Sequence, residues 1–123
     1  MSNGCGSVYI QVFRRLFVML GERLERVWVK VHHSKTGETI VAACDEDLLG
    51  RKLNIGNGVL VEVSRAFYGG VLINRDELDR YLKQATIVNL LGDCAVSYAI
   101  SRGYAVEKAM VKIDGVPHLQ LFL

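Results

Sequence analysis

The stretch Asp114-Gly115-Val116-Pro117-His118 constrains the fold of this chain more than any other. Asp-Gly between two apolar residues predicts a tight two-residue hairpin turn, because both central residues of that turn need a positive φ. Pro117 is the only proline and has no N–H, so we expect it to confine its strand to the edge of a sheet. The chain should therefore end in a hairpin of strands near 110–113 and 116–122.

The strands expected before this hairpin lie near 27–32, 39–43 and 59–63. In the first of them apolar and polar residues alternate, so that Trp28, Lys30 and His32 should share one face. A glycine-containing loop joins the first strand to the second, which predicts another antiparallel hairpin. A turn cluster at 54–58 precedes the third strand.

Two helices are expected between the third strand and the closing hairpin, at about 75–85 and 87–102. Asn74 followed by Glu77 is a capping-box pattern, which predicts where the first helix starts. The second helix should be the core helix, because only one polar stripe interrupts its apolar surface: Asn89, Asp93, Ser97 and Ser101. Gly92 within it indicates the close approach of another backbone. The predicted fold class is α+β: a small, mostly antiparallel sheet packed against two helices and closed by the C-terminal hairpin.

The length of 123 residues suits one domain, and half of the residues are hydrophobic. We expect a single α+β domain over 27–123, preceded by an N-terminal extension over 1–26 that is partly disordered or helical. The small polar residues of 1–6 predict disorder. Apolar residues from Val8 to Leu24 fit both strand and helix spacing, and we favour a helix from about Val12 to Glu25.

Neither a membrane-spanning run nor a secretory signal is recognisable, so we expect a cytoplasmic protein with no membrane partner. The three cysteines are far apart in the sequence and form no Cys-x-x-Cys pair, which argues against a zinc framework. Cys94 is expected in the core, and the acids after Cys44 should raise the pKa of its thiol. His32 and His33 are adjacent in a strand and point to opposite faces, so we expect no metal and no cofactor.

Charge gives little support to a nucleic-acid partner for the body of the chain. Residues 27–123 contain equal numbers of basic and acidic residues, and the positive surplus lies entirely within 1–26. A basic face is possible only if the acids gather elsewhere.

The candidate binding residues fall in four places: Phe67, Tyr68, Gly69, Gly70, Asn89, Asp93, Pro117 and His118. The aromatic pair could stack on a base, or fill the core and cover its rim. The glycine pair could approach a phosphate or satisfy a turn, and the polar pair could bind a ligand or face solvent. His118 could be a general base, a metal ligand or a phosphate contact, or simply bond to backbone. No nucleophile motif is present, so no catalytic residue can be assigned and enzymatic activity stays open.

Four ordered segments resemble the archaeal family known as domain of unknown function 424. They are Val41 to Gly50, Phe67 to Gly70, Ala85 to Gly92 and Gly115 to His118, and the similarity covers roughly 27–122. The family has no established activity, and its small archaeal members are associated with translation or RNA metabolism. Its members begin near the first strand, which implies that 1–26 is an extension or that translation starts at Met19.

Three functions follow as hypotheses. The first, which the resemblance favours, is a non-enzymatic binding module for RNA or the ribosome. The second is a small-ligand enzyme with its site near Tyr68 and His118. The third is a protein-interaction module or homodimer that uses segment 8–20 and the proline-marked strand. The most useful observation for choosing among these hypotheses is whether Tyr68, Asn89 and His118 converge on one concave surface.

Overall fold

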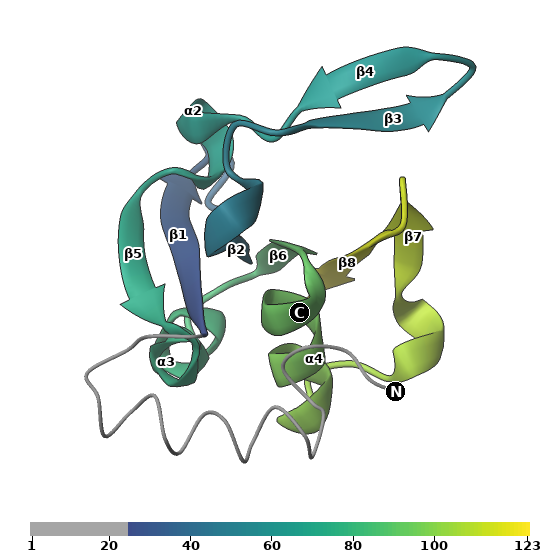
Figure 1. Ribbon diagram of the computed structural model, residues 1–123. Helices are drawn as coiled ribbons and strands as arrows, with labels where there is room; N and C mark the ends of the chain where they lie inside the picture. The colour runs from purple at the N-terminus through teal and green to yellow at the C-terminus, as the bar shows by residue number, and fades with distance from the viewer. Residues whose placement is uncertain (1–24) are drawn as a thin grey trace, which may run out of the picture.

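The computed structural model describes residues 25–123, in which a six-stranded sheet forms the centre of the fold (Figure 1). The predicted disordered segment 1–6 and the predicted helix from Val12 lie outside the described residues. The strand order is β5-β1-β2-β6-β8-β7, and every neighbouring pair is antiparallel except β2 and β6, which are parallel. The strands are β1 (Arg26–His33), β2 (Thr39–Asp45), β5 (Val71–Asn74), β6 (Ile87–Leu91), β7 (Val111–Ile113) and β8 (Val116–Phe122).

The α+β class and the closing hairpin are confirmed. Asp114 and Gly115 have φ values of 53° and 77°, the positive values that the two-residue turn needs. The expectation that Pro117 marks an edge strand is wrong, because β8 pairs with β6 on one side and β7 on the other. Pro117 is tolerated because the β6 ladder ends at the pair Leu91–His118, so no strand partner faces the missing N–H.

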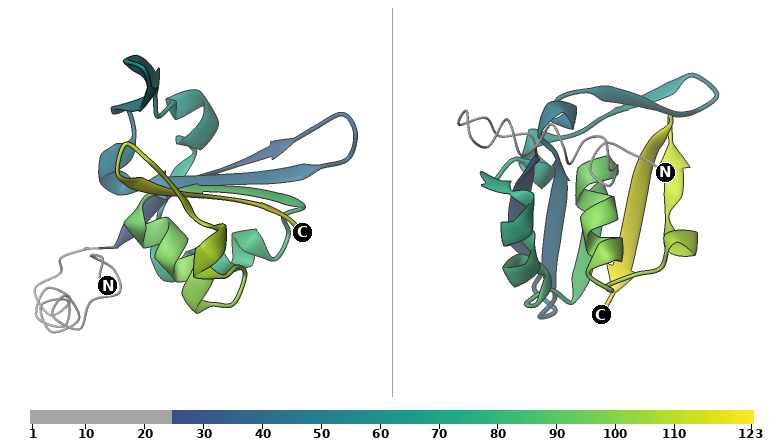
Figure 2. Two further views of the ribbon diagram at one scale, coloured as in Figure 1. Left: turned by 90° about the vertical axis from the view of Figure 1, so that its right-hand side faces the viewer. Right: turned by 60° about the horizontal axis from the view of Figure 1, so that its bottom comes forward.

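One face of the sheet is covered by helices and holds the larger core (Figure 2). The helices are α3 (Leu78–Leu82), which follows the 3₁₀ turn η2 (Arg75–Glu77), and α4 (Asp93–Ser101). The capping box of Asn74 and Glu77 is present at the start of η2. Alternation along the strands directs one set of apolar side chains into this core, including Val27, Val29, Val41, Val88, Leu90 and Leu119.

The other face is covered only at one end. The 3₁₀ turn η1 (Glu46–Leu48), helix α2 (Arg65–Tyr68) and a separate hairpin of β3 (Lys52–Gly56) and β4 (Val59–Glu62) pack there over Ala42, Cys44 and Leu91. The left view of Figure 2 shows the strands continuing to the right, beyond the described elements drawn above them. Part of this face is therefore left without a covering layer by residues 25–123.

The predicted helix 87–102 is partly wrong, since Ile87–Leu91 is a strand and only Asp93–Ser101 is helical. β6 lies between β2 and β8 with core on both of its faces, so its residues are apolar on nearly every side. A strand of this kind and a buried helix have the same apolar pattern over a short run. The predicted helix 75–85 is also shorter than expected, ending at Leu82.

Two further differences concern short strands. The segment expected at 59–63 is a strand, but β4 pairs with β3 outside the main sheet, and β3 occupies part of the predicted turn at 54–58. β5 was not predicted; it pairs with β1 at the sheet edge. The 3₁₀ turn η3 (Glu107–Ala109) leads into β7.

Asp45 joins the end of β2 to the start of α4. Its carboxylate accepts hydrogen bonds from the backbone N–H groups of Cys94 and Ala95, both at 2.9 Å, and makes no capping hydrogen bond to η1. Gly92 has a φ of +110°, and a Cβ there would lie 2.3 Å from Cγ of Asp45. Gly92 is thus required by the close approach of a carboxylate. Burial raises the pKa of Asp45 to about 6, although both N–H donors act in the opposite direction.

Replacing Asp45 with Ala should lower the free energy of unfolding by about 2 kcal/mol, because two N–H groups in the first turn of α4 lose their acceptor. Chemical denaturation followed by circular dichroism measures this difference. Asp47→Ala is the matched control, since Asp47 is an exposed acid in the same segment. Equal losses for the two variants would contradict the structural role of Asp45.

Candidate functional site

Tyr68, Asn89 and His118 meet on the second face of the sheet. Asn89 and His118 come from the neighbouring strands β6 and β8, and Tyr68 reaches them from α2. The Tyr68 hydroxyl donates a hydrogen bond of 2.6 Å to Oδ1 of Asn89. Nε2 of His118 lies 3.3 Å from the same oxygen. The three residues that sequence analysis singled out therefore form one hydrogen-bonded chain.

The protonation states of Tyr68 and His118 follow from the acceptor that they share, Oδ1 of Asn89. Because Oδ1 of Asn89 can only accept, Nε2 of His118 must carry a hydrogen. Burial lowers the pKa of His118 from 6.5, so the ring is neutral at pH 7 and Nδ1 keeps its lone pair. No residue within 25–123 bonds to Nδ1. Burial raises the pKa of Tyr68, so its hydroxyl stays protonated as a donor.

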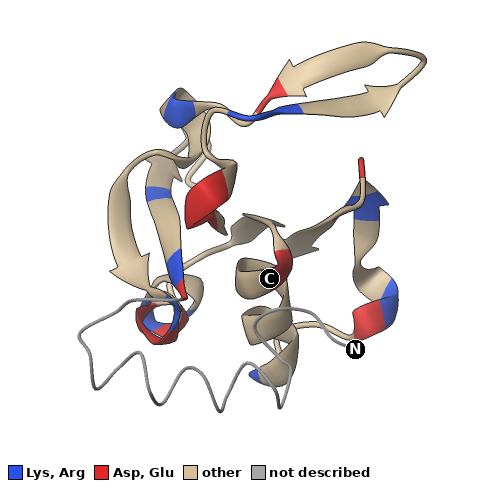
Figure 3. Ribbon diagram, in the orientation of Figure 1, with Lys and Arg blue, Asp and Glu red and all other residues tan. Residues whose placement is uncertain are grey.

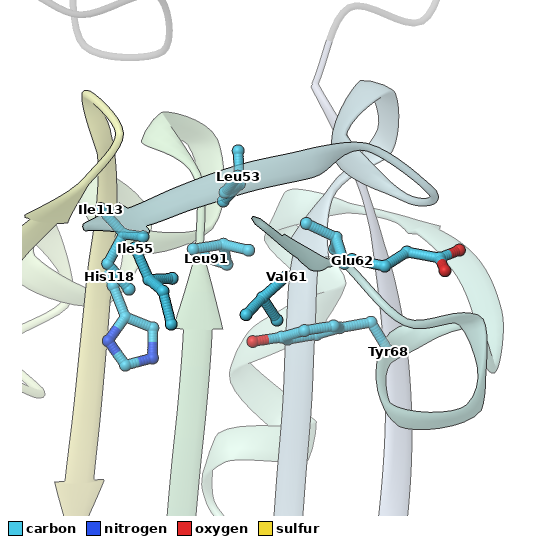
Figure 4. Close-up of a pocket in the computed structure, with 9 residues that line it drawn as sticks. Leu53, Ile55, Val61, Glu62, Tyr68, Leu91, Ile113 and His118 are labelled. Atoms are coloured by element: carbon cyan, nitrogen blue, oxygen red, sulfur yellow. The ribbon is translucent and has the colours of Figure 1, made fainter. Parts of the chain in front are cut away.

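A small pocket lies between the side chains of Tyr68 and His118 and the hairpin of β3 and β4 (Figure 4). In the figure Tyr68 and His118 flank the pocket, with Leu91 between them and Ile55 and Val61 reaching down from the hairpin. The pocket has a volume of about 120 Å³. That is close to the size of cavities that hold one benzene ring, and smaller than the usual site of a nucleotide-sized ligand.

Beyond the pocket the sheet is open. The register places Lys30, Asn89 and Gln120 in one row across the strands, and His32, Ile40, Ile87 and Phe122 in the next. We call these seven residues, together with Phe67, the open face. His32 stacks on Phe67 with ring centroids 5.1 Å apart and an interplanar angle of 18°. Phe122 is 74% exposed.

The other candidate residues have different positions. Gly69 and Gly70 are accounted for by packing, because a Cβ on Gly70 would lie 2.2 Å from the carbonyl oxygen of Val29. Asp93 is exposed in the first turn of α4, on the opposite face of the sheet. Pro117 is buried, and its carbonyl accepts a hydrogen bond from Gly92. Tyr68 is buried as well, so within the aromatic pair only Phe67 offers part of its ring to solvent.

Sequence analysis missed six residues of the open face as binding candidates, and the polar or aromatic ones among them are Lys30, His32, Gln120 and Phe122. Alternation in 27–32 had already placed the first two on the polar side of a strand. The same alternation along 116–122 places Gln120 and Phe122 on the same face of the strand as His118. The missing information was that α3 and α4 both pack on the other face of the sheet.

Charges of both signs are scattered over residues 25–123 (Figure 3). Near the open face, the Arg65 guanidinium lies 5.9 Å from the ring centroid of Trp28. Within the same range no three His, Cys, Asp or Glu side chains gather as a metal site. None of the described helices is long and apolar enough to cross a membrane. Both described cysteines are buried, and burial, followed by Asp45 and Asp47, raises the pKa of Cys44 to about 12.

His118 should titrate below its ordinary pKa of 6.5, because its cationic form is desolvated. Asn89→Asp should raise that pKa by one to three units (roughly), since a carboxylate would then face Nε2. Histidine ring shifts followed by NMR against pH measure both values. A pKa that does not respond to Asn89→Asp would show that the two side chains are not in contact.

Comparison with known proteins gives a family and a related structure. A family model described as "Protein of unknown function (DUF424)" matches residues 33–123. The crystal structure of an uncharacterized conserved protein from Methanopyrus kandleri is similar, with a TM-score of 0.69 and 31% sequence identity. The similarity covers 79% of this chain and 90% of that chain. No curated protein matches.

Proposed function

Since the chain belongs to the family described as "Protein of unknown function (DUF424)", which assigns no activity, we propose a function from its geometry. The protein is a non-enzymatic binding module that takes single-stranded RNA on the open face of its sheet. The resemblance noted from the sequence motifs adds translation or RNA metabolism as the setting.

The observation that supports this proposal is the combination of ring and amide groups on the open face. His32 and Phe67 form a stack at one side, and Phe122 lies exposed at the other. Between them Asn89 and Gln120 are direct cross-strand partners, so two amides lie side by side. Unpaired bases stack on aromatic side chains and are read by amide groups at their edges. A base-paired helix exposes neither its base faces nor most of these edges, so the surface fits a single strand.

The charges support binding by stacking more than by phosphate contacts. Basic and acidic residues are equal in number over 25–123, and Lys30 is the only lysine or arginine among the open-face residues. With Arg65 near by, about two phosphates would be neutralised. The logarithm of the binding constant should then fall with the logarithm of salt concentration with a slope of only about −1.4.

Phe122→Ala should weaken binding to short oligouridine or oligoadenosine by about five- to a hundredfold, because one stacking platform is lost. Fluorescence anisotropy of labelled RNA at low salt measures this. Phe122 is exposed near the end of β8, so its removal should leave the fold intact.

Val106→Ala is the matched control, because Val106 is 66% exposed and lies away from the open face, before η3. It should bind RNA as the wild type does. The proposal fails if the wild-type chain does not bind single-stranded RNA at low salt, or if both variants weaken binding equally.

The small-ligand alternative has a specific observation in its favour, namely the pocket beside the Tyr68–Asn89–His118 chain. A one-ring molecule such as phenol should shift the NMR signals of the Ile55 and Leu91 methyl groups, which line the pocket. Leu91 should respond more strongly, because it is buried behind the pocket and Ile55 is half exposed. Unchanged methyl signals at saturating phenol would contradict a ligand site there.

A further inference from the structure

The outer edge of β4 has backbone groups without partners. Asn54 of β3 donates its N–H to Oδ2 of Asp114, away from β4. Asn54 and its cross-strand neighbour Leu60 are therefore a non-hydrogen-bonded pair, and the N–H and C=O of Leu60 point away from β3. The same alternation directs the groups of Glu62 outward. Neither residue has a hydrogen-bond partner on that side among residues 25–123.

The edge has few of the features by which proteins protect such strands, namely its short length and the single charge of Glu62. β4 contains no proline and no lysine, and the irregularity of this hairpin lies between Asn54 and Gly56 in β3. Every residue of β4 is exposed, and Leu60 is 59% exposed. By contrast, the edge strand β7 is three residues long and carries Lys112. A mainly apolar edge with a single charge at one end is suited to pairing with another strand.

We propose that β4 pairs with β4 of a second copy of this chain, antiparallel about a two-fold axis at Leu60. This goes beyond RNA binding and does not depend on it. In this register Leu60 of one copy faces Leu60 of the other, and Val59 faces Val61. The outward groups of Leu60 then bond to each other across the axis, as antiparallel strands require.

Charge favours a second copy in this register. Glu62, the only charged residue of β4, falls opposite Gly58 of the other copy, so the two carboxylates stay apart. A shift that placed Glu62 opposite itself would bring like charges together and cost stability. The pairing also makes an isologous interface, in which one strand supplies both halves and the assembly closes at two. Ile55, Val59 and Val61, which are half exposed in one copy, then form a continuous apolar strip over both hairpins.

The test is a charge swap at the axis, measured by sedimentation equilibrium on the full chain over a wide concentration range. The wild type should associate reversibly to twice its mass of 13.7 kDa. Leu60→Lys and Leu60→Glu should each weaken association by tenfold or more (roughly), because like charges would face each other. An equimolar mixture of the two variants should associate at least about ten times more tightly than either alone.

A backbone variant supplies the second measurement. Leu60→Pro removes the leucine side chain together with the outward N–H, which β3 does not use, and Leu60→Ala removes the side chain but keeps that N–H. The proline variant should be monomeric where the alanine variant still associates. A wild type that stays monomeric at every concentration, a mixture no tighter than its components, or equal association of the Pro and Ala variants would each overturn the proposal. Association through another part of the chain or with a different partner would give one of these results.

Discussion

The contact between Asp45 and the first turn of α4 ties the end of β2 to the helix that follows β6. β2 and β6 are the only parallel neighbours in the sheet, and Asp45 ends the first while Gly92 follows the second. The carboxylate bonds to two N–H groups that α4 cannot satisfy internally, next to the positive end of the helix. Gly92 is needed because any side chain there would displace the carboxylate. The direction in which α4 leaves β6 follows from this contact.

That direction decides which face of the sheet is available for binding. α4 packs against β1, β2, β6 and β8 on one side, together with α3. The second side has only η1, α2 and the hairpin of β3 and β4, all at one end. Asn89, Gln120 and Phe122 stay accessible for this reason, and the pocket forms where the hairpin lies over Leu91 and His118. The family motifs fall around this arrangement, with Asp45 and Gly92 supporting it and Tyr68, Asn89 and His118 lying within it.

The binding surfaces that we propose share one physical property, which is that their polar or apolar groups lack a complete set of partners within the described residues. On the open face these are the faces of the aromatic rings and the amide of Gln120, which lie on the main sheet or beside it. On β4 they are backbone groups beside exposed aliphatic side chains. The first suits a ligand with flat, polar-edged units, and the second suits another extended strand. The two proposed surfaces are formed by different residues, so the proposed RNA binding and the proposed pairing of two copies would not compete.

Local sequence determined the features that depend on neighbouring residues. The Asp114–Gly115 turn, the capping box at Asn74 and the alternation in β1 and β8 each follow from the conformational or pairing needs of a few residues. Tertiary structure decided whether Ile87–Leu91 is helix or strand, because burial on both faces removes the periodicity that separates them. It also placed Pro117 inside the sheet, at a position beyond the end of the β6 ladder. The meeting of Tyr68, Asn89 and His118 depended on strand order, which brings β6 beside β8 and next to β2, where α2 packs. No local pattern encodes that order.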